Sequence, residues 1–357
     1  MNPVVIDGSQ GEGGGQILRT SVTLSCILGI PVKIQKIRAG REEPGLRPQH
    51  LQAVKSAAEI ANSKLLGASV GSGEIELHPG EPEKLIRKKV DTGTAGSVTL
   101  IAQTLIPIAL FRGLDLDAEI VGGTEVPASP SIDYLQKLVL PLYQKLGGYV
   151  EIQLKRRGYY PRGGGIIRIL VHGPKSKMRA LKFEPSSADF SKEGARILAV
   201  ARNLPAHIPA REVGAAKKVL AENGMNVSDS DVDSSNESYS PGTSILIFRQ
   251  SDLQYAGAGA LGARGKSSEQ VGSEAAQSFV EETRGSPNFD SHLSDMAVTL
   301  LSCTVGDSSF TTSKVTRHLE TNLKVASQIT GCEYSVSEKS DRGNYEVKLS
   351  GRDEKPI

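Results

Sequence analysis

The residue best suited to nucleophilic chemistry is His318, in the segment Thr316-Arg317-His318-Leu319-Glu320-Thr321-Asn322. It stands at the expected start of an apolar-periodic helix, where the helix dipole disfavours an imidazolium and favours the neutral, nucleophilic ring. A lone histidine at a helix start is more often a cap or a surface residue. His50 begins an equivalent segment, so the alternative is that both histidines only cap the helices that they begin.

A glycine-rich stretch offers a complementary anion site. Gly8, Gly11, Gly13, Gly14 and Gly15 stand between a short apolar run and an apolar-periodic segment, an order that predicts strand, turn and helix. Glycines in such a turn let backbone N–H groups face an anion at the helix N-terminus. A tight turn packed against a helix would use the same residues, so both interpretations stay open.

Three arginines surround a loop before the helix that His50 begins: Arg38, Arg41 and Arg47. Guanidinium groups suit phosphate oxygens, although a solvated surface loop would carry the same residues. Gln103, which is polar within an apolar stretch, is either a hydrogen-bonded core amide or a ligand contact.

An internal repeat supplies the elements that must position these residues. Ser21-Val22-Thr23-Leu24 recurs as Ser97-Val98-Thr99-Leu100 and, more loosely, as Ala297-Val298-Thr299-Leu300. Each copy lies in an apolar helix that is followed by a strand-like run, a second helix and two β runs. The pattern predicts an α/β (α+β) fold of three βαβαββ units packed as a pseudo-threefold body.

A segment rich in Ser, Ala and Gly interrupts the third unit. We expect residues 1–183 to hold units one and two and the first strand of unit three, residues 184–274 to form a small inserted α/β domain, and residues 275–357 to complete unit three. Within the insert, strands are predicted at 197–201 and 243–248 and a helix at 210–223. The polar run 229–240 is expected to be a mobile loop.

Composition limits the function classes. The chain has 357 residues, a net charge of +2 and no tryptophan. This composition argues against binding along an extended stretch of duplex nucleic acid, and it allows a local basic pocket. Cys26, Cys303 and Cys332 lack metal-ligand spacing, which suits a reducing compartment. The chain lacks a signal peptide pattern, and its longest apolar run, Val98 to Phe111, is short for a bilayer. We therefore expect a cytoplasmic protein with no membrane partner.

Several segments resemble the RNA 3'-terminal phosphate cyclase family. The resemblance rests on the run from Gln10 to Arg19, on Arg38-Ala39-Gly40-Arg41 with Pro44-Gly45-Leu46-Arg47 and Gln49-His50, on Arg157-Gly158-Tyr159-Tyr160-Pro161-Arg162-Gly163-Gly164-Gly165, and on the segment around His318. It extends, with gaps, from about Ile6 to the helix after His318, and that family has an insert at the corresponding place.

The resemblance implies an ATP-dependent ligase that converts an RNA 3'-phosphate end to a 2',3'-cyclic phosphate through an adenylyl-histidine and an RNA-adenylate, releasing pyrophosphate and AMP. His318 would be the nucleophile, and Mg²⁺ or Mn²⁺ would assist. The implied ATP contacts are Gln103, Pro130, His292, Leu293, Ser294, Asp295 and Met296. The implied contacts to phosphates and the RNA end are Glu12, Arg19, Arg38, Arg41 and Gln49, with Glu12 and Asp295 also as metal ligands. The family often has Gln where Met296 stands, which puts a side-chain amide contact there in doubt.

Two rival functions remain. Gly265-Lys266-Ser267 is close to the end of a nucleoside triphosphatase phosphate-binding loop, but Ala260 stands where its first glycine is required and no clear buried strand precedes it. A non-catalytic relative serving as an RNA-processing scaffold would lack the nucleophile, so His318 and Glu12 count against it. The oligomeric state stays open, with a homodimer as one alternative.

Overall fold

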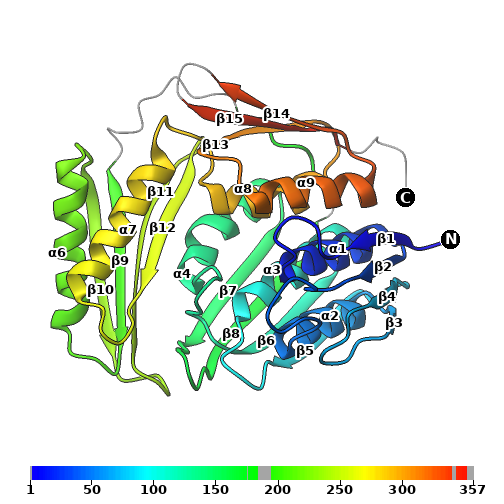
Figure 1. The fold of residues 1–357 in the computed structure, drawn as a ribbon, viewed down its shortest axis with the longest axis horizontal. Helices are drawn as coiled ribbons and strands as arrows, with labels where there is room; N and C mark the ends of the chain where they lie inside the picture. The colour runs from blue at the N-terminus through cyan, green and yellow to red at the C-terminus, as the bar shows by residue number, and fades with distance from the viewer. Residues whose placement is uncertain (1, 175, 184–193, 340–342, 352–357) are drawn as a thin grey trace.

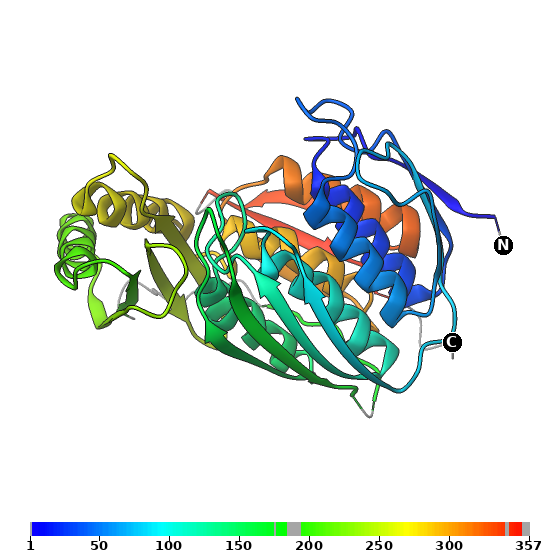
Figure 2. The ribbon, with the colours of Figure 1, turned by 90° about the horizontal axis from the view of Figure 1, so that it is seen from below.

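Three sheets surround a central group of helices in the computed structural model (Figures 1 and 2). It describes residues 2–174, 176–183, 194–339 and 343–351. Helix α1 (Gly15–Leu28) packs against α2 (Pro48–Ile60), α3 (Val98–Arg112) and α9 (Arg317–Thr330). Helix α1 therefore contacts helices from all three predicted units.

Units one and two share one strand order. Unit one contains β1 (Val4–Asp7), α1, β2 (Val32–Gln35), α2, β3 (Lys64–Leu66) and β4 (Ile75–His78), with sheet order β1-β2-β4-β3. Unit two contains β5 (Leu85–Asp91), α3, β6 (Asp115–Gly122), the helical run α4 (Ile132–Tyr134), η1 (Leu135–Val139) and α5 (Leu140–Lys145), then β7 (Tyr149–Arg156) and β8 (Gly165–His172), with order β5-β6-β8-β7. In both, the first pair of strands is parallel and the others are antiparallel.

The third sheet follows the same plan. Its order is β13-β15-β14, formed by β13 (Ser308–Thr312), β14 (Tyr334–Lys339) and β15 (Asn344–Leu349), and helices α8 (Ser291–Leu301) and α9 cover it. Arg179 and Lys182 form parallel bridges to Val305 and Ser309, where a first strand would lie. The α/β fold class is thus confirmed, and the shared strand order agrees with the repeat. The pseudo-threefold symmetry stays a prediction.

Helix α3 shows why the longest apolar run is a core element. Its apolar residues are buried on every side, including Ile101, Leu105 and Ile108, because α1 and α2 cover it on one side and β6 and β8 on the other. None of the helices in the described part of the chain has the length and apolar character needed to span a bilayer.

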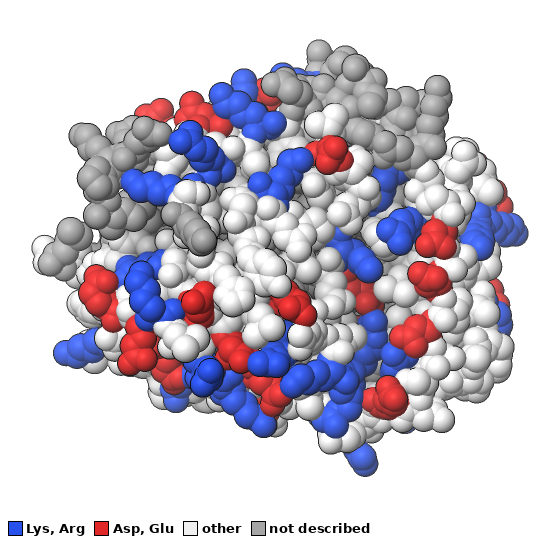
Figure 3. Space-filling view, turned by 180° about the vertical axis from the view of Figure 1, so that it is seen from behind, with Lys and Arg blue, Asp and Glu red and all other residues white. Residues whose placement is uncertain are grey.

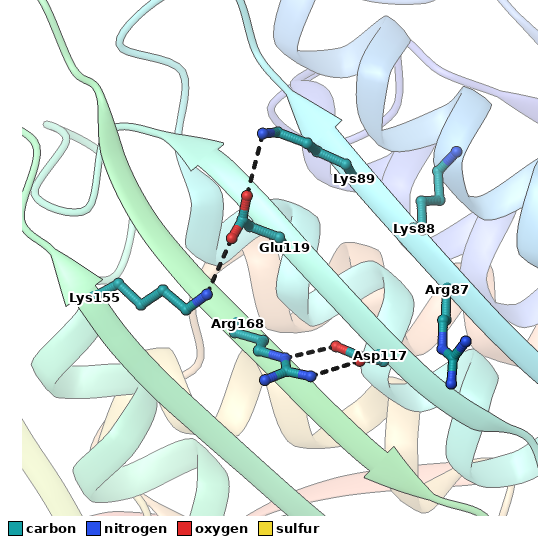
Figure 4. A pocket seen from close by; sticks show the side chains of 7 residues that line it. All are labelled: Arg87, Lys88, Lys89, Asp117, Glu119, Lys155 and Arg168. Carbon is teal, nitrogen blue, oxygen red and sulfur yellow. Dashed lines mark hydrogen bonds and ion pairs between the residues drawn. The ribbon is translucent and has the colours of Figure 1, made fainter.

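Charges of both signs lie on the face turned away from the viewer in Figure 1. On the face seen in Figure 3, Lys and Arg residues are interspersed with Asp and Glu. On the outer face of unit two's sheet, Arg168 donates two hydrogen bonds of 2.8 and 2.7 Å to Asp117, and Glu119 pairs with Lys89 and Lys155 at 3.3 and 3.1 Å (Figure 4). These cross-strand ion pairs fit a solvated sheet face whose opposite side is apolar.

The insert has its own sheet and core. Its elements are β9 (Ala195–Arg202), α6 (His207–Glu222), β10 (Val227–Ser235), β11 (Gly242–Gln250), β12 (Tyr255–Leu261) and α7 (Ser268–Thr283), with order β10-β9-β11-β12. Ile197, Leu220, Ile247 and Phe279 belong to a buried cluster separate from the main core. In Figure 1 this unit stands beside the repeat body.

The loop predicted at 229–240 is wrong over most of its length, since β10 extends to Ser235. It is an edge strand paired in parallel with β9, so its exposed side chains need not be apolar. Arg202 of β9 pairs with Asp233 at 2.6 Å, and Arg196 pairs with Asp229 at 3.7 Å. These arginines offset the acidic charge that made the run look unstructured.

The phosphate-loop expectation also needs correction, because the buried strand β12 does precede Gly265-Lys266-Ser267. Lys266 is nonetheless paired with Glu274. Ser267 caps α7 by accepting a 3.2 Å hydrogen bond from the Gln270 N–H. Both side chains that would hold a phosphate therefore already have structural partners.

Only one of the two predicted boundaries of the insert falls on described residues. Its predicted first residue, 184, lies outside the described residues. Its predicted last residue, 274, falls inside α7, which packs along α6 and β12. We propose that the insert ends after α7, at Thr283.

Glu212 makes the stability of the insert pH-dependent. Its carboxyl group is buried on α6 with both oxygens 2.9 Å from the Thr243 hydroxyl, and burial raises its pKa from 4.5 to about 7. Between those values the folded state binds more protons than the unfolded state, so stability falls as pH rises from about 4.5 to 7. Glu212→Gln should remove this pH-dependent loss in the free energy of unfolding, which is on the order of 3 kcal/mol or less.

Urea unfolding at pH 5 and pH 8 measures this effect. We expect the wild type to lose stability between the two values and Glu212→Gln to lose less. Glu222→Gln, an exposed change on the same helix, should follow the wild type. Equal pH dependence in all three proteins would contradict the assignment to Glu212.

Candidate active site

The glycine loop carries Glu12 to the start of α9. Gly11 has φ +59°, and a Cβ atom there would lie 2.0 Å from the Thr321 Oγ1 of α9. Only glycine allows this contact without a shift of the backbone or of Thr321. The loop is therefore closely packed. At its end, Gly14 is the N-cap residue of α1 and has no side chain to cap the first N–H groups.

His318 is the second residue of α9 and faces that loop. Thr316 caps the helix by accepting a 2.9 Å hydrogen bond from the Leu319 N–H. His318 Nε2 lies 3.2 Å from Glu12 Oε2, and 38% of its side chain is exposed. The imidazole is thus held by a carboxylate while it remains accessible to a substrate.

The environment of His318 lowers the pKa of its imidazole and so favours the neutral ring. Burial is the largest cause that lowers the pKa of His318, and Arg19, Arg41 and His292 lower it further, while Glu12 opposes the shift. The Arg41 Nη2 lies 3.8 Å from the same Glu12 oxygen. Burial also lowers the pKa of Arg19 to about 10, so that guanidinium remains charged at neutral pH.

His50 has a different environment, which separates the two histidines. Its side chain is buried, its Nδ1 accepts a 3.4 Å hydrogen bond from the Arg47 N–H, and its ring packs against Gly15. Burial, with Arg19 and Arg38, lowers the pKa of His50 to about 3. His50 is therefore a neutral capping residue of α2 beneath the start of α1.

The remaining predicted phosphate ligands divide into two groups. Gln49 joins Arg19 and His50 in lining a small cavity between α1, α2 and α3. Arg38 instead donates a 3.1 Å hydrogen bond to the Glu43 carbonyl within its own loop. The structure thus gathers Glu12, Arg19, Arg41 and Gln49 about the start of α1, and it gives Arg38 a local partner.

Gln103 and Pro130 lie on neighbouring segments of unit two. The Thr99 hydroxyl of α3 donates a 2.7 Å hydrogen bond to the Pro130 carbonyl. Gln103, one turn further along α3, has a buried Nε2 atom without a hydrogen-bond partner among the described residues. Because buried amides are normally satisfied, this disagrees with the core-amide alternative and favours a ligand contact.

The five residues from His292 to Met296 open α8 and point in different directions. His292 is exposed and Met296 is partly exposed, whereas Leu293 and Ser294 are fully buried. The Ser294 hydroxyl donates a 2.8 Å hydrogen bond to the Asp290 carbonyl. The side chains of Leu293 and Ser294 therefore support the helix, and those of His292 and Met296 remain accessible.

Asp295 supports the helix that carries His318. Its Oδ1 accepts a 2.6 Å hydrogen bond from the Thr316 hydroxyl, and its backbone carbonyl accepts a 2.7 Å bond from Asn322 Nδ2. Burial, with Asp290, Glu282 and Glu12, raises the pKa of Asp295 to about 8. Across the described ranges, no group of three or more His, Cys, Asp or Glu side chains is placed to hold a metal ion.

Sequence reasoning missed two supporting residues, Asp290 and Thr316. Each is the N-cap of a helix: Asp290 accepts 2.9 Å hydrogen bonds from the N–H groups of His292 and Leu293, and Thr316 caps α9. An Asp or Thr directly before an apolar-periodic segment is the signal that would have found them.

Comparison with known proteins identifies the family of this chain. The chain matches the family described as RNA 3'-terminal phosphate cyclase over residues 10–336. The chain belongs to this family. Similar proteins named RNA 3'-terminal phosphate cyclase include those of Thermococcus kodakarensis, 43% identical over 94% of this chain and 95% of the relative, and Pyrobaculum aerophilum, 39% identical over 98% of both. A third, from Pyrococcus abyssi, is 42% identical over 92% of this chain and 93% of the relative.

Asp295 variants separate a positioning role from metal ligation in this cyclase-family site. Asp295→Asn keeps an acceptor for the Thr316 hydroxyl, so the magnesium concentration giving half-maximal ATP consumption should be unchanged. Asp295→Ala leaves Thr316 without that partner and should lower the free energy of unfolding by about 1–2 kcal/mol.

Titration with MgCl₂ and urea unfolding provide the two measurements. Glu12→Gln serves as the comparison, because an exposed carboxylate at the site is the better metal ligand and its loss should raise the magnesium requirement. An equal rise in Asp295→Asn would contradict the positioning role.

Proposed function

We propose that this protein uses ATP to convert RNA 3'-phosphate ends to 2',3'-cyclic phosphates, with His318 as the residue that becomes adenylylated. The observation that carries the proposal is the position of His318: an accessible imidazole 3.2 Å from Glu12, whose same carboxylate oxygen lies 3.8 Å from Arg41. Family membership supports the overall reaction.

The first step joins His318 to AMP. A ring nitrogen of the neutral imidazole attacks the α-phosphorus of ATP, a phosphoramidate bond forms, and the bond to the bridging oxygen breaks to release pyrophosphate. Arg19 and Arg41 are placed to stabilise the negative charge that builds up on the phosphate oxygens. Glu12 orients the ring through its contact with Nε2.

The next two steps move AMP onto the RNA and then release it. An oxygen of the RNA 3'-phosphate attacks the phosphorus of adenylyl-His318, which frees the histidine and forms a mixed anhydride. The neighbouring 2'-hydroxyl then attacks the 3'-phosphorus, the cyclic ester closes and AMP leaves. Because the hydroxyl and the phosphate belong to one ribose, proximity supplies much of the acceleration.

Among the described residues, the site offers a divalent cation few protein ligands. Glu12 offers one exposed carboxylate beside the expected triphosphate position, and Mg²⁺ commonly uses one or two carboxylates together with substrate phosphates and water. When bound, Mg²⁺ or Mn²⁺ would screen the phosphate charges. Asp295 suits this role less well, because its carboxyl group is buried and hydrogen-bonded to Thr316.

The nucleotide contacts and the location belong to the same proposal. Gln103 would contact the base or ribose of ATP through its Nε2 atom, which has no hydrogen-bond partner among the described residues. Pro130 is hydrogen-bonded to Thr99, which lies one turn before Gln103 on the same helix. We place the protein in the cytoplasm, in keeping with its RNA substrate and with three cysteines that form no disulfide. A homodimer remains one alternative for its assembly.

Histidine variants test the covalent step. Incubation with ATP labelled at the α-phosphate should leave acid-labile, base-stable label on the wild type, as expected of a phosphoramidate. His318→Ala should abolish the label with a stability change of about 1 kcal/mol or less, the usual limit for a residue at a helix start. His50→Ala should still be labelled. Identical behaviour of the two variants would mean that the nucleophile is misassigned.

A DNA 3'-phosphate separates activation from ring closure. It offers the same phosphate to adenylyl-His318 but has no 2'-hydroxyl, so a DNA-adenylate should accumulate while RNA ends yield cyclic product and AMP. Gel separation of the 3'-ends and chromatography of the released nucleotides measure both. Cyclisation of RNA with ADP as the only nucleotide product would replace the scheme by direct phosphoryl transfer.

A further inference from the structure

The tip of the β7–β8 hairpin carries an exposed aromatic and cationic surface outside the site described above. Tyr160 is 75% exposed and Tyr239, from the insert, is 54% exposed. Arg162 is also exposed, and it forms no ion pair within the described part of the chain. No step of the proposed reaction uses these three residues.

The base of this tip is held firmly in unit two. Arg157 is buried, donates hydrogen bonds of 2.7 and 2.8 Å to Asp133, and pairs with Glu125. The Gly158 N–H donates a 3.0 Å hydrogen bond to the Thr124 hydroxyl. A buried network of this kind fixes the orientation of the hairpin.

The insert holds the other side of the tip. Tyr159 is buried against Gly242, and the Arg162 N–H donates a 3.3 Å hydrogen bond to the Ser240 hydroxyl. Tyr159 therefore turns inward, and Tyr160 is left outward at a junction between two structural units.

Tyr239 is already arranged as a stacking surface. The guanidinium carbon of Arg156 lies 4.0 Å from the centre of the Tyr239 ring, and Arg156 Nε donates a 2.8 Å hydrogen bond to the Gly164 carbonyl. A Cβ atom on Gly164 would lie 2.3 Å from the same ring. The ring is thus held against the hairpin, while residue Tyr239 as a whole remains 54% exposed.

A short contact path connects the tip with the active site. Gly163 packs against Ala95, where a Cβ atom on the glycine would lie 2.8 Å from the Ala95 Cα. Gly96, the next residue of that loop, packs in the same way against Gln49, at 3.2 Å from its Cβ. A chain whose end is held near Gln49 can therefore continue over the hairpin tip.

We propose that this tip binds the nucleotides preceding the RNA 3'-phosphate, with bases stacked on Tyr160 and Tyr239 and a backbone phosphate bound by Arg162. The proposal rests on the proposed function and names the form of its substrate, a single-stranded 3' end. Stacking on aromatic rings tolerates any base but requires unpaired ones, and an arginine supplies the phosphate contact. Two rings make a local platform, in keeping with the low aromatic content of the chain.

The absence of tryptophan from the chain allows a direct binding assay. Tyr160→Trp introduces a sole tryptophan at the tip, and Tyr149→Trp introduces one at an exposed position at the other end of β7. A single-stranded decanucleotide with a 3'-phosphate should quench the fluorescence of the first variant and not that of the second. Equal quenching in both, or equal quenching by a blunt duplex, would overturn the proposal.

Kinetics with substrates of two lengths provide the second test. Tyr160→Ala should lower kcat/KM about tenfold for a decanucleotide 3'-phosphate and less than about twofold for a dinucleotide 3'-phosphate. Tyr149→Ala should match the wild type on both. An equal loss on both substrates would contradict a platform for upstream nucleotides.

The binding assay and α-phosphate labelling distinguish failure of this inference from failure of the proposed function. Labelling without RNA reports only on ATP and His318. A labelled protein whose tip tryptophan is not quenched refutes the platform alone. A quenched but unlabelled protein supports the platform and refutes the adenylylation scheme.

Discussion

The buried carboxylate of Asp290 is the contact on which the arrangement of the site depends. The Tyr134 hydroxyl donates to it and lies 2.7 and 2.9 Å from its two oxygens, the Gly257 N–H donates a 2.9 Å hydrogen bond, and two more come from the first turn of α8. These donors belong to unit two, the insert and unit three. Burial raises the pKa of Asp290, and the hydrogen bonds from Tyr134 and Leu293 oppose that shift by stabilising the carboxylate.

From Asp290 the support continues to His318 through short polar contacts. Asp290 caps α8, Asp295 of α8 accepts the Thr316 hydroxyl, and Thr316 caps α9. Thr20 of α1 then donates a 2.9 Å hydrogen bond to the Asn322 of α9, which places the glycine loop against the same helix. His318 is thereby fixed relative to Glu12 by buried contacts, while its own ring remains accessible.

The sequence predicted the parts of this site that depend on local order. The glycine run before α1 and the apolar character of α3 identify their elements without knowledge of the fold, and the repeat predicted a common order of elements along the chain; the order of strands within the sheets comes from the structure. Burial of Asp295 depends on long-range packing against α9, which residue spacing does not show. The strand β10 was missed for a related reason: its acidic side chains are matched by arginines of β9 that only strand pairing brings close.

The central claim is that AMP becomes covalently attached to His318, and peptide mapping tests it most directly. The protein is incubated with ATP and magnesium without RNA, digested under alkaline conditions that preserve a phosphoramidate, and analysed by mass spectrometry. The account predicts a peptide carrying the mass of AMP at His318 and loss of that mass after acid treatment. AMP on a lysine or on His50, or no adduct while RNA ends are still cyclised, would contradict it.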